Sequence, residues 1–219
     1  LQSQRLDYHR TDNVSEKYCG AIRITGDHSV IENCVIRNNR HISTYYGGGG
    51  VYMSSAKIIN TKITDNESNG QGGGIYASGG YVINCLVSNN TAQMSGGVYG
   101  SPALVLNSTI VNNSSEHSYA TDYAGLRTHS SEVINCIVWG NTHNGEYAEV
   151  LTSGGSVSHS AIHGGYAGTN NIDIALDNDG DNESLNYIRF IDAEHDVFEL
   201  TDNSVAVDAG LNGNANIPN

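Results

Sequence analysis

The sequence predicts an all-β fold: a single-stranded right-handed parallel β-helix, with about six recognisable coils and a C-terminal cap. The chain repeats every 23 to 28 residues, three positions of each copy are aliphatic, and Gly, Asn and Ser separate the short apolar runs. Short β-branched runs broken by turn residues are typical of strands, and a repeat of this length is typical of a solenoid.

Six segments of 13 residues align without a gap: 24–36, 51–63, 75–87, 98–110, 126–138 and 150–162. Their first position holds Ile24, Val51, Ile75, Val98, Leu126 and Val150. Their second aliphatic position holds Ile31, Ile58, Val82, Val105, Val133 and Val157, and their third holds Ile36, Ile63, Val87, Ile110, Val138 and Ile162. We expect stacked coils to bury these residues, with a rise of about 4.8 Å per coil.

The domain organisation follows from where the spacing varies. All variation in repeat length falls after the third aliphatic position, so one corner of the coil accommodates the insertions. We expect an N-terminal cap over residues 1–17, coils over 18–164 and a closing segment of the same domain over 165–219.

A column of asparagines follows the second aliphatic position. It contains Asn33, Asn60, Asn84, Asn107 and Asn135, with His159 in the sixth coil. Asn tolerates left-handed backbone angles, and stacked amides can hydrogen-bond from coil to coil. The column therefore predicts a structural amide ladder at this turn, while Ser88 is expected to face solvent.

The next column consists of small residues that are expected to point inward: Cys34, Thr61, Cys85, Ser108, Cys136 and Ser160. Its cysteines fall in alternate coils, two rises or roughly 10 Å apart. A disulfide needs Cα atoms within about 7 Å, so these cysteines are predicted to be free, buried thiols. The chain has no CxxC pair that would suggest a zinc or redox site.

The charge balance excludes two classes of partner. The chain carries 10 basic and 23 acidic residues, a formal net charge of −13. Nucleic acid and anionic membranes are therefore not expected to bind. No apolar run approaches the about 20 residues of a membrane span. We expect flanking domains or an anchor outside this sequence.

The stretches GGGVY…IINTKITDN, GGGIY…VINCLVSNN and SGGVY…LVLNSTIVNN resemble the β-helix repeats of polymorphic outer membrane proteins and of pectate-lyase-like surface proteins of gut bacteria. The tail YIRFIDAEHDVFELTDNSVAVDAG is similar to the closing segment of the choice-of-anchor Q family, although Ala206 stands where that family prefers Pro. The resemblance implies a secreted or bacterial cell-surface protein. It implies no particular activity, because a fold alone does not specify one.

The residues that directly follow the first aliphatic position form the first candidate binding surface. They are Thr25, Tyr52, Tyr76, Tyr99, Arg127 and Leu151. Exposed tyrosines bind sugar rings through apolar contact and hydrogen bonds. The alternative is a tyrosine ladder that covers the sheet and packs against itself. The glycine pairs that precede it, Gly49-Gly50, Gly73-Gly74 and Gly96-Gly97, predict a tight corner.

Two long loops at the variable corner, 40–47 and 114–123, are predicted to flank a saddle about 14 Å wide. They contribute candidate carbohydrate-binding residues, which are His41, Tyr45, Tyr46, Tyr119 and Tyr123. Glu116, His117 and Asp122 are candidates for acid/base catalysis. A polyuronate lyase would need clustered Arg and Lys, so the acidic balance favours neutral glycans.

An acidic run near the C-terminus is a candidate cation site. Its alternating carboxylates, Asp177, Asp179, Asp181 and Glu183, are suited to Ca²⁺, although the run lacks a full twelve-residue calcium loop. A solvated acidic turn is the alternative, and no other cofactor is expected.

Three functional classes follow. The leading one is a secreted or cell-surface module that binds polysaccharide or another glycan without catalysis, or acts as an adhesin. A β-helical polysaccharide lyase or glycoside hydrolase is the second, and a structural spacer of a larger surface protein is the third.

Overall fold

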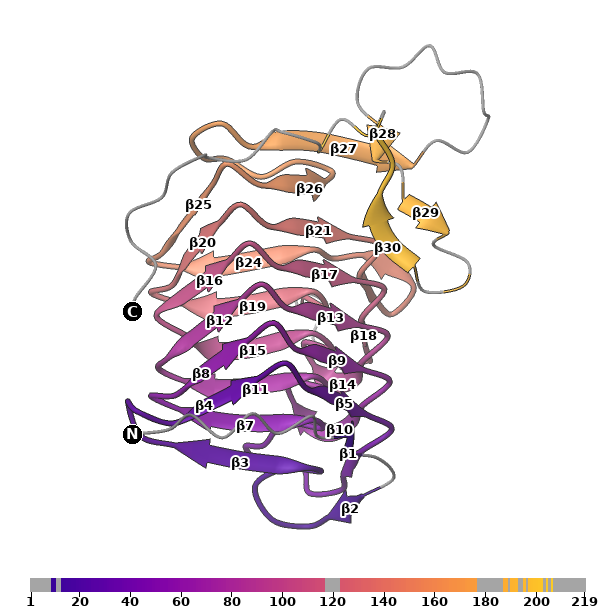
Figure 1. The fold of residues 1–219 in the computed structure, drawn as a ribbon. Helices are drawn as coiled ribbons and strands as arrows, with labels where there is room; N and C mark the ends of the chain where they lie inside the picture. The colour runs from indigo at the N-terminus through magenta and orange to yellow at the C-terminus, as the bar shows by residue number, and fades with distance from the viewer. Residues whose placement is uncertain are drawn as a thin grey trace.

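The computed structural model describes residues 9–10, 13–116, 123–176, 187–188, 190–192, 195, 197–202, 204 and 206. They form a parallel β-solenoid of about six turns, which confirms the predicted fold class (Figure 1). The described residues contain no α-helix, and none of their segments is a helix long and apolar enough to span a bilayer.

Most turns contribute one short strand to each of four sheets. The nine-stranded sheet contains, in order, β1 (His9–Arg10), β5 (Val35–Arg37), β9 (Lys62–Thr64), β13 (Leu86–Ser88), β17 (Thr109–Val111), β21 (Ile137–Trp139), β26 (Ala161–His163), β27 (Ile172–Leu176) and β28 (Tyr187–Ile188). The seven-stranded sheet contains β2 (Val14–Ser15), β6 (Arg40–His41), β10 (Glu67–Gln71), β14 (Thr91–Met94), β18 (Ser114–Ser115), β22 (Thr142–His143) and β23 (Glu146–Tyr147). The variable corner is thus itself a sheet, whose last pair, β22 and β23, is antiparallel.

Two six-stranded sheets complete the solenoid. The first contains β3 (Ile22–Thr25), β7 (Val51–Ser54), β11 (Ile75–Ser78), β15 (Val98–Ser101), β19 (Leu126–His129) and β24 (Val150–Ser153). The second contains β4 (Val30–Glu32), β8 (Lys57–Ile59), β12 (Tyr81–Ile83), β16 (Leu104–Leu106), β20 (Glu132–Ile134) and β25 (Ser156–Ser158). Alternation along these strands sends every second side chain into the core.

The three aliphatic columns form the core, and all their members except Ile24 are buried. The gap-free alignment is wrong in the first coil. There Ile22 pairs with Val51, and Ile24 pairs with Met53. Two extra residues lie in the turn before β4, so that Ile31 still pairs with Ile58. The alignment misplaced the register because Ile22 and Ile24, two residues apart, both fit an inward position.

The predicted asparagine column adopts left-handed angles, with φ from 49° to 54°, but the amide ladder lies elsewhere. The buried ladder is formed by Asn39, Asn66, Asn90, Asn113 and Asn141, six residues later in each coil. The Nδ2 of each of the first four donates to Oδ1 of the asparagine in the following coil, at distances of 2.8 to 3.0 Å. In the predicted column, Asn60, Asn84 and Asn107 are exposed.

The column of small residues is buried as predicted, and none of the four cysteines, all of them among the described residues, forms a disulfide. Hydrogen bonds join a cysteine of this column to the serine of the following coil. The backbone N–H of Cys85 donates to Ser108 Oγ at 3.1 Å, and that hydroxyl donates to the carbonyl of Leu106 at 2.9 Å. The same pattern joins Cys136 to Ser160.

The closing segment packs on the outer face of the nine-stranded sheet. It contains the antiparallel pair β29 (Phe190–Asp192) and β30 (Val197–Leu200) (Figure 1). Phe198 joins an apolar cluster with Val111 and Trp139, and the rings of Trp139 and Phe190 lie 5.9 Å apart. Ser88 pairs with Val111 on this face and is only 1% exposed, so the prediction that it faces solvent is wrong.

Candidate functional site

Two parallel rows of side chains occupy the outer face of the first six-stranded sheet. The register aligns one row, called here the tyrosine row, as Arg23, Tyr52, Tyr76, Tyr99, Arg127 and Leu151. A second row, the hydroxyl row, consists of Thr25, Ser54, Ser78 and Ser101. Thr25 was predicted to belong to the tyrosine row. It belongs instead to the hydroxyl row, because the first coil is shifted by two residues.

Strand alternation places both rows outside. In β7 the side chains of Val51 and Met53 are buried, while those of Tyr52 and Ser54, which alternate with them along the strand, are partly exposed. The hydroxyl row could have been found from the sequence, because VYMS, IYAS and VYGS each end in a serine two residues after the tyrosine. Each of these three coils therefore presents one phenol and one aliphatic hydroxyl on this face.

The three tyrosines of the row stack on one another. The ring centroids of Tyr52 and Tyr76 are 5.2 Å apart with planes inclined by 11°, and those of Tyr76 and Tyr99 are 5.8 Å apart at 23°. Ring faces are thus turned toward neighbouring rings along the solenoid axis. The row therefore offers ring edges and hydroxyl groups to a ligand. Its three rings pack on one another as in the tyrosine ladder predicted as the alternative to a sugar-binding surface.

Arginines flank the three tyrosines of the row on both sides. The Arg23 guanidinium carbon is 4.2 Å from the ring centroid of Tyr18 and 5.6 Å from that of Tyr52. On the other side, the Arg127 guanidinium carbon is 5.6 Å from the Tyr99 centroid. Such cation–π contacts hold each guanidinium against an aromatic ring. The first of these contacts was missed because the sequence alignment put Thr25 where Arg23 lies.

The first long loop reaches the tyrosine row. Tyr46, which is 64% exposed, contacts Tyr76 edge-on, with ring centroids 5.9 Å apart. The loop lies against the following coil, where Asn69 Nδ2 donates to the carbonyl of Ile42 at 3.1 Å. Tyr45 in the same loop is 78% exposed. Tyr46 and the tyrosine row therefore belong to one surface, a relationship that the sequence left open.

Tyr76 lies at the centre of this aromatic cluster. Burial raises the pKa of its hydroxyl to about 12, and the neighbouring phenols Tyr52, Tyr99 and Tyr46 add to the shift. The Tyr76 hydroxyl is therefore protonated at neutral pH and can both donate and accept a hydrogen bond.

His41, predicted to bind carbohydrate, does not belong to this surface. Its side chain is fully buried, with Nδ1 3.2 Å from Ser68 Oγ and Nε2 in contact with the Lys17 carbonyl. Burial lowers the pKa of His41, and the bond to Lys17 opposes that change. The side chain points inward because β6 alternates, with Arg40 outside and His41 inside.

The remaining candidates are only partly described. Glu116 is exposed directly after β18 and lines a pocket with Thr142 and Asn144, while Tyr123 is half-buried. His117, Tyr119 and Asp122 lie outside the described residues, as do the calcium candidates Asp177, Asp179, Asp181 and Glu183. Within the described part of the chain, no group of three or more His, Cys, Asp or Glu side chains could hold a metal ion.

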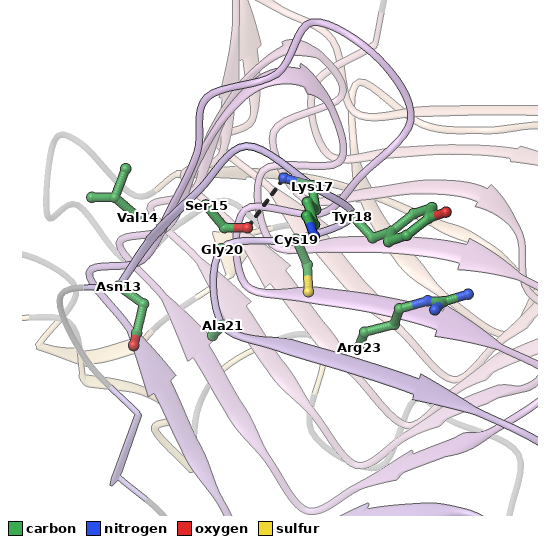
Figure 2. A pocket seen from close by; sticks show the side chains of 9 residues that line it. All are labelled: Asn13, Val14, Ser15, Lys17, Tyr18, Cys19, Gly20, Ala21 and Arg23. Carbon is green, nitrogen blue, oxygen red and sulfur yellow. Dashed lines mark hydrogen bonds between the residues drawn. The ribbon is translucent and has the colours of Figure 1, made fainter.

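A second pocket adjoins the N-terminal end of the tyrosine row. It is lined by Asn13, Val14, Ser15, Lys17, Tyr18, Cys19, Gly20, Ala21 and Arg23 (Figure 2). Tyr18 and Arg23 extend in the same direction from it, which agrees with their cation–π contact. This pocket therefore continues the aromatic and basic surface beyond Tyr52.

Compared with known proteins, the chain matches no family model, no curated protein and no solved structure at a significant level. The parallel solenoid is therefore established by its strand pairing. The resemblance to surface-protein repeats rests only on the repeat sequences quoted above.

Proposed function

We propose that the chain is a secreted or cell-surface module that binds a neutral polysaccharide without catalysis, on the outer face of the first six-stranded sheet. The observation that carries this proposal is the pairing of the tyrosine row with the hydroxyl row, in register over four coils. A periodic face with a rise of about 4.8 Å per coil suits a periodic polymer lying along the solenoid axis.

Polar and aromatic contacts would share the binding. Serine and tyrosine hydroxyls donate and accept hydrogen bonds, as sugar hydroxyls do. Because the faces of Tyr52, Tyr76 and Tyr99 are turned toward one another, apolar contact with a sugar ring falls to the exposed loop rings of Tyr45 and Tyr46. The guanidinium groups on both sides of the three tyrosines supply further donors for sugar oxygens.

The charge balance supports a neutral ligand. With a net charge of −13, the chain as a whole repels a polyanion. The two arginines of the tyrosine row stand apart, one on each side of the three tyrosines, rather than in a cluster that would neutralise a uronate.

The same proposal includes a bacterial surface location, an adhesive role, a pectate-lyase-like kinship and flanking domains or an anchor. They are supported by the repeat cadence and by the closing segment quoted above. A structural spacer is the second candidate, and the mutual stacking of the three tyrosine rings favours it.

A glycan array of neutral and acidic polysaccharides tests the proposal, followed by calorimetric titration of the best ligand. We expect Ser54→Ala/Ser78→Ala/Ser101→Ala and Tyr45→Ala/Tyr46→Ala each to weaken binding at least about tenfold, the loss of one or two good contacts. Ser156→Ala, an exposed serine on the second six-stranded sheet, is the matched control. No array signal, or unchanged affinity in both variants, would leave the chain a spacer. Release of reducing ends from a bound polysaccharide would instead indicate an enzyme.

A further inference from the structure

The asparagine ladder is directional and ends on a buried carboxylate. From Asn39 to Asn113, each ladder Nδ2 donates one of its hydrogens to the asparagine of the following coil, so the last asparagine, Asn141, needs another acceptor in that direction. Glu149 provides that acceptor: Asn141 Nδ2 donates to Oε2 at 2.6 Å, and the Asn141 backbone N–H donates to the same oxygen at 3.2 Å. Glu149 is only 6% exposed.

The other oxygen of Glu149 faces a histidine of the next coil. Oε1 lies 3.2 Å from Nδ1 of His163, which is on β26. The His163 ring also packs edge-on against Tyr147 of β23, with centroids 4.1 Å apart. Asp173 of β27 acts electrostatically on His163 and favours its protonated form. One carboxylate thus joins the end of the ladder, the β22–β23 hairpin and the last coil.

We propose that Glu149 is a proton-operated latch, in which the neutral carboxyl group fastens the β22–β23 hairpin to the end of the solenoid and its ionisation promotes local opening of that hairpin. The protonated acid fits the site well. It can accept from Asn141 through Oε2 and donate through Oε1 to His163 Nδ1. An ionised carboxylate keeps its acceptor role but must hold a negative charge away from water.

The direction of the effect follows from proton linkage. Burial raises the pKa of Glu149 from 4.5 to about 7, although the bonds from Asn141 and the Gly140 backbone oppose the rise. A raised pKa means that the closed state binds the proton more tightly than an open, solvated state does. The latch is therefore fully effective below pH 4.5 and weakens as pH rises through 7. Burial lowers the pKa of His163, and the charge of Asp173 opposes that change.

The hairpin is the element that this charge would release. It is the last element of the seven-stranded sheet. The residue that follows the hairpin hydrogen-bonds to the ladder: the Ala148 N–H donates to the carbonyl of Asn141 at 2.9 Å. Opening it would solvate Glu149 and expose the edge of β22. The coils before it keep their own inter-coil bonds, because each contacts only its neighbours.

Amide hydrogen exchange between pH 5 and 9, corrected for intrinsic rates, measures this opening directly. In the wild type we expect the opening constants of Asn141 and Ala148 to rise on the order of a hundredfold as Glu149 ionises. The Ile75 amide, which bonds Gly97 at 3.0 Å in mid-solenoid, should not follow them. Flat opening constants at Asn141 and Ala148, or an equal change at Ile75, would overturn the latch.

Two variants separate the latch from a general charge effect. Glu149→Gln can accept from Asn141 and donate to His163 like the protonated acid, and we expect it to remove the pH dependence. Glu146→Gln removes the same charge from an exposed position of β23 and should behave like the wild type. An unaltered pH dependence in Glu149→Gln would contradict the proposal. Should that variant fail to fold, the carboxyl carbon shift of Glu149 in the wild type decides: titration near pH 7 supports the latch, and titration near 4.5 overturns it.

Discussion

Asn90 Nδ2 donates to Asn113 Oδ1 at 2.9 Å, while Asn90 Oδ1 accepts from Asn66 Nδ2 at 3.0 Å. The same Nδ2 donates to the carbonyl of Ile63, and the same Oδ1 accepts the backbone N–H of Asn66. All four hydrogen-bonding sites of this buried amide are used. A single side chain therefore ties together three successive coils.

Replacing Asn90 should destabilise the solenoid strongly. Asn90→Leu keeps the branching of the side chain but is larger and apolar. It strands the backbone N–H of Asn66, one Nδ2 hydrogen of Asn66 and the carbonyl of Ile63. Each stranded buried group costs about 1–3 kcal/mol, so we expect a loss of at least about 3 kcal/mol in the free energy of unfolding, measured with urea. Asn84→Gly is the control, because an exposed residue at φ 52° loses little on replacement by glycine. Equal losses in the two variants would contradict the ladder assignment.

The aliphatic core could be predicted from the sequence, whereas the position of the ladder could not. Buried β-branched residues recur because only stacked coils can bury them, and their columns are visible without a structure. Asparagines, however, recur in two columns six residues apart, exemplified by Asn84 and Asn90. Both suit turns, and side-chain direction distinguishes them: Asn84 takes a left-handed turn and points to solvent, while Asn90 faces the interior.

The register of the first coil and the outer-face contacts show a second limit. Ile22 and Ile24 satisfy the inward pattern equally well, and only the longer turn before β4 decides between them. That choice determines whether Arg23 or Thr25 neighbours Tyr52. The contact of Tyr46 with Tyr76 depends on a loop that folds back onto the next coil, which local periodicity does not encode. The burial of Ser88 on an outer face is likewise not visible in the repeat.

The corner formed by the glycine pairs should tolerate no side chain, because a Cβ would clash with neighbouring backbone. A Cβ on Gly73 would lie 2.5 Å from the Gly96 carbonyl oxygen and 2.6 Å from that of Thr91. Gly73→Ala must therefore push backbone apart, and we expect a loss of about 3 kcal/mol or more in urea unfolding. At Gly145, φ is +85° and no atom lies within 4 Å of the added Cβ. Gly145→Ala should cost only about 1 kcal/mol of backbone strain, and a larger loss there than at Gly73 would contradict the close-packing explanation.

The buried thiols should be inert in the native state. Burial raises the pKa of Cys85 and of Cys136 to about 12, so the reactive thiolate is scarce at pH 8 and the sulfur is shielded as well. With a thiol-specific disulfide reagent, we expect rapid reaction of four thiols in denaturant. In native buffer, Cys85 and Cys136 should react only at the rate of unfolding. Fast native labelling of either one, located by peptide mapping, would place that side chain outside the core.

Serine should replace cysteine in this column with little loss. Ser108 and Ser160 already occupy equivalent positions, and each donates to the carbonyl two residues earlier. In Cys85→Ser the hydroxyl can donate in the same way to Ile83, which the thiol approaches at 3.2 Å. We expect a change within about 1 kcal/mol in the free energy of unfolding, because the new hydroxyl is hydrogen-bonded. Cys85→Leu, which adds volume to a filled core, should cost about 1–3 kcal/mol. A loss in the serine variant equal to that in the leucine variant would argue against interchangeable positions.

The buried hydroxyl of Tyr76 should make the stability of the solenoid depend on pH in the alkaline range. The folded pKa of Tyr76, about 12, lies above the ordinary value of 10, so the native state holds the phenol proton more tightly than the unfolded chain. This contribution to stability is complete below pH 10 and is lost as pH rises through 12. The urea midpoint should therefore fall between pH 9.5 and 11.5 by less in Tyr76→Phe than in the wild type. Tyr45→Phe, an exposed phenol of the same surface, should follow the wild type. Carbon-13 labelling of tyrosine provides the direct measurement, since one resonance should titrate near pH 12 and disappear in Tyr76→Phe. An ordinary titration near pH 10 for that resonance would show that the stacked rings leave the Tyr76 hydroxyl open to water.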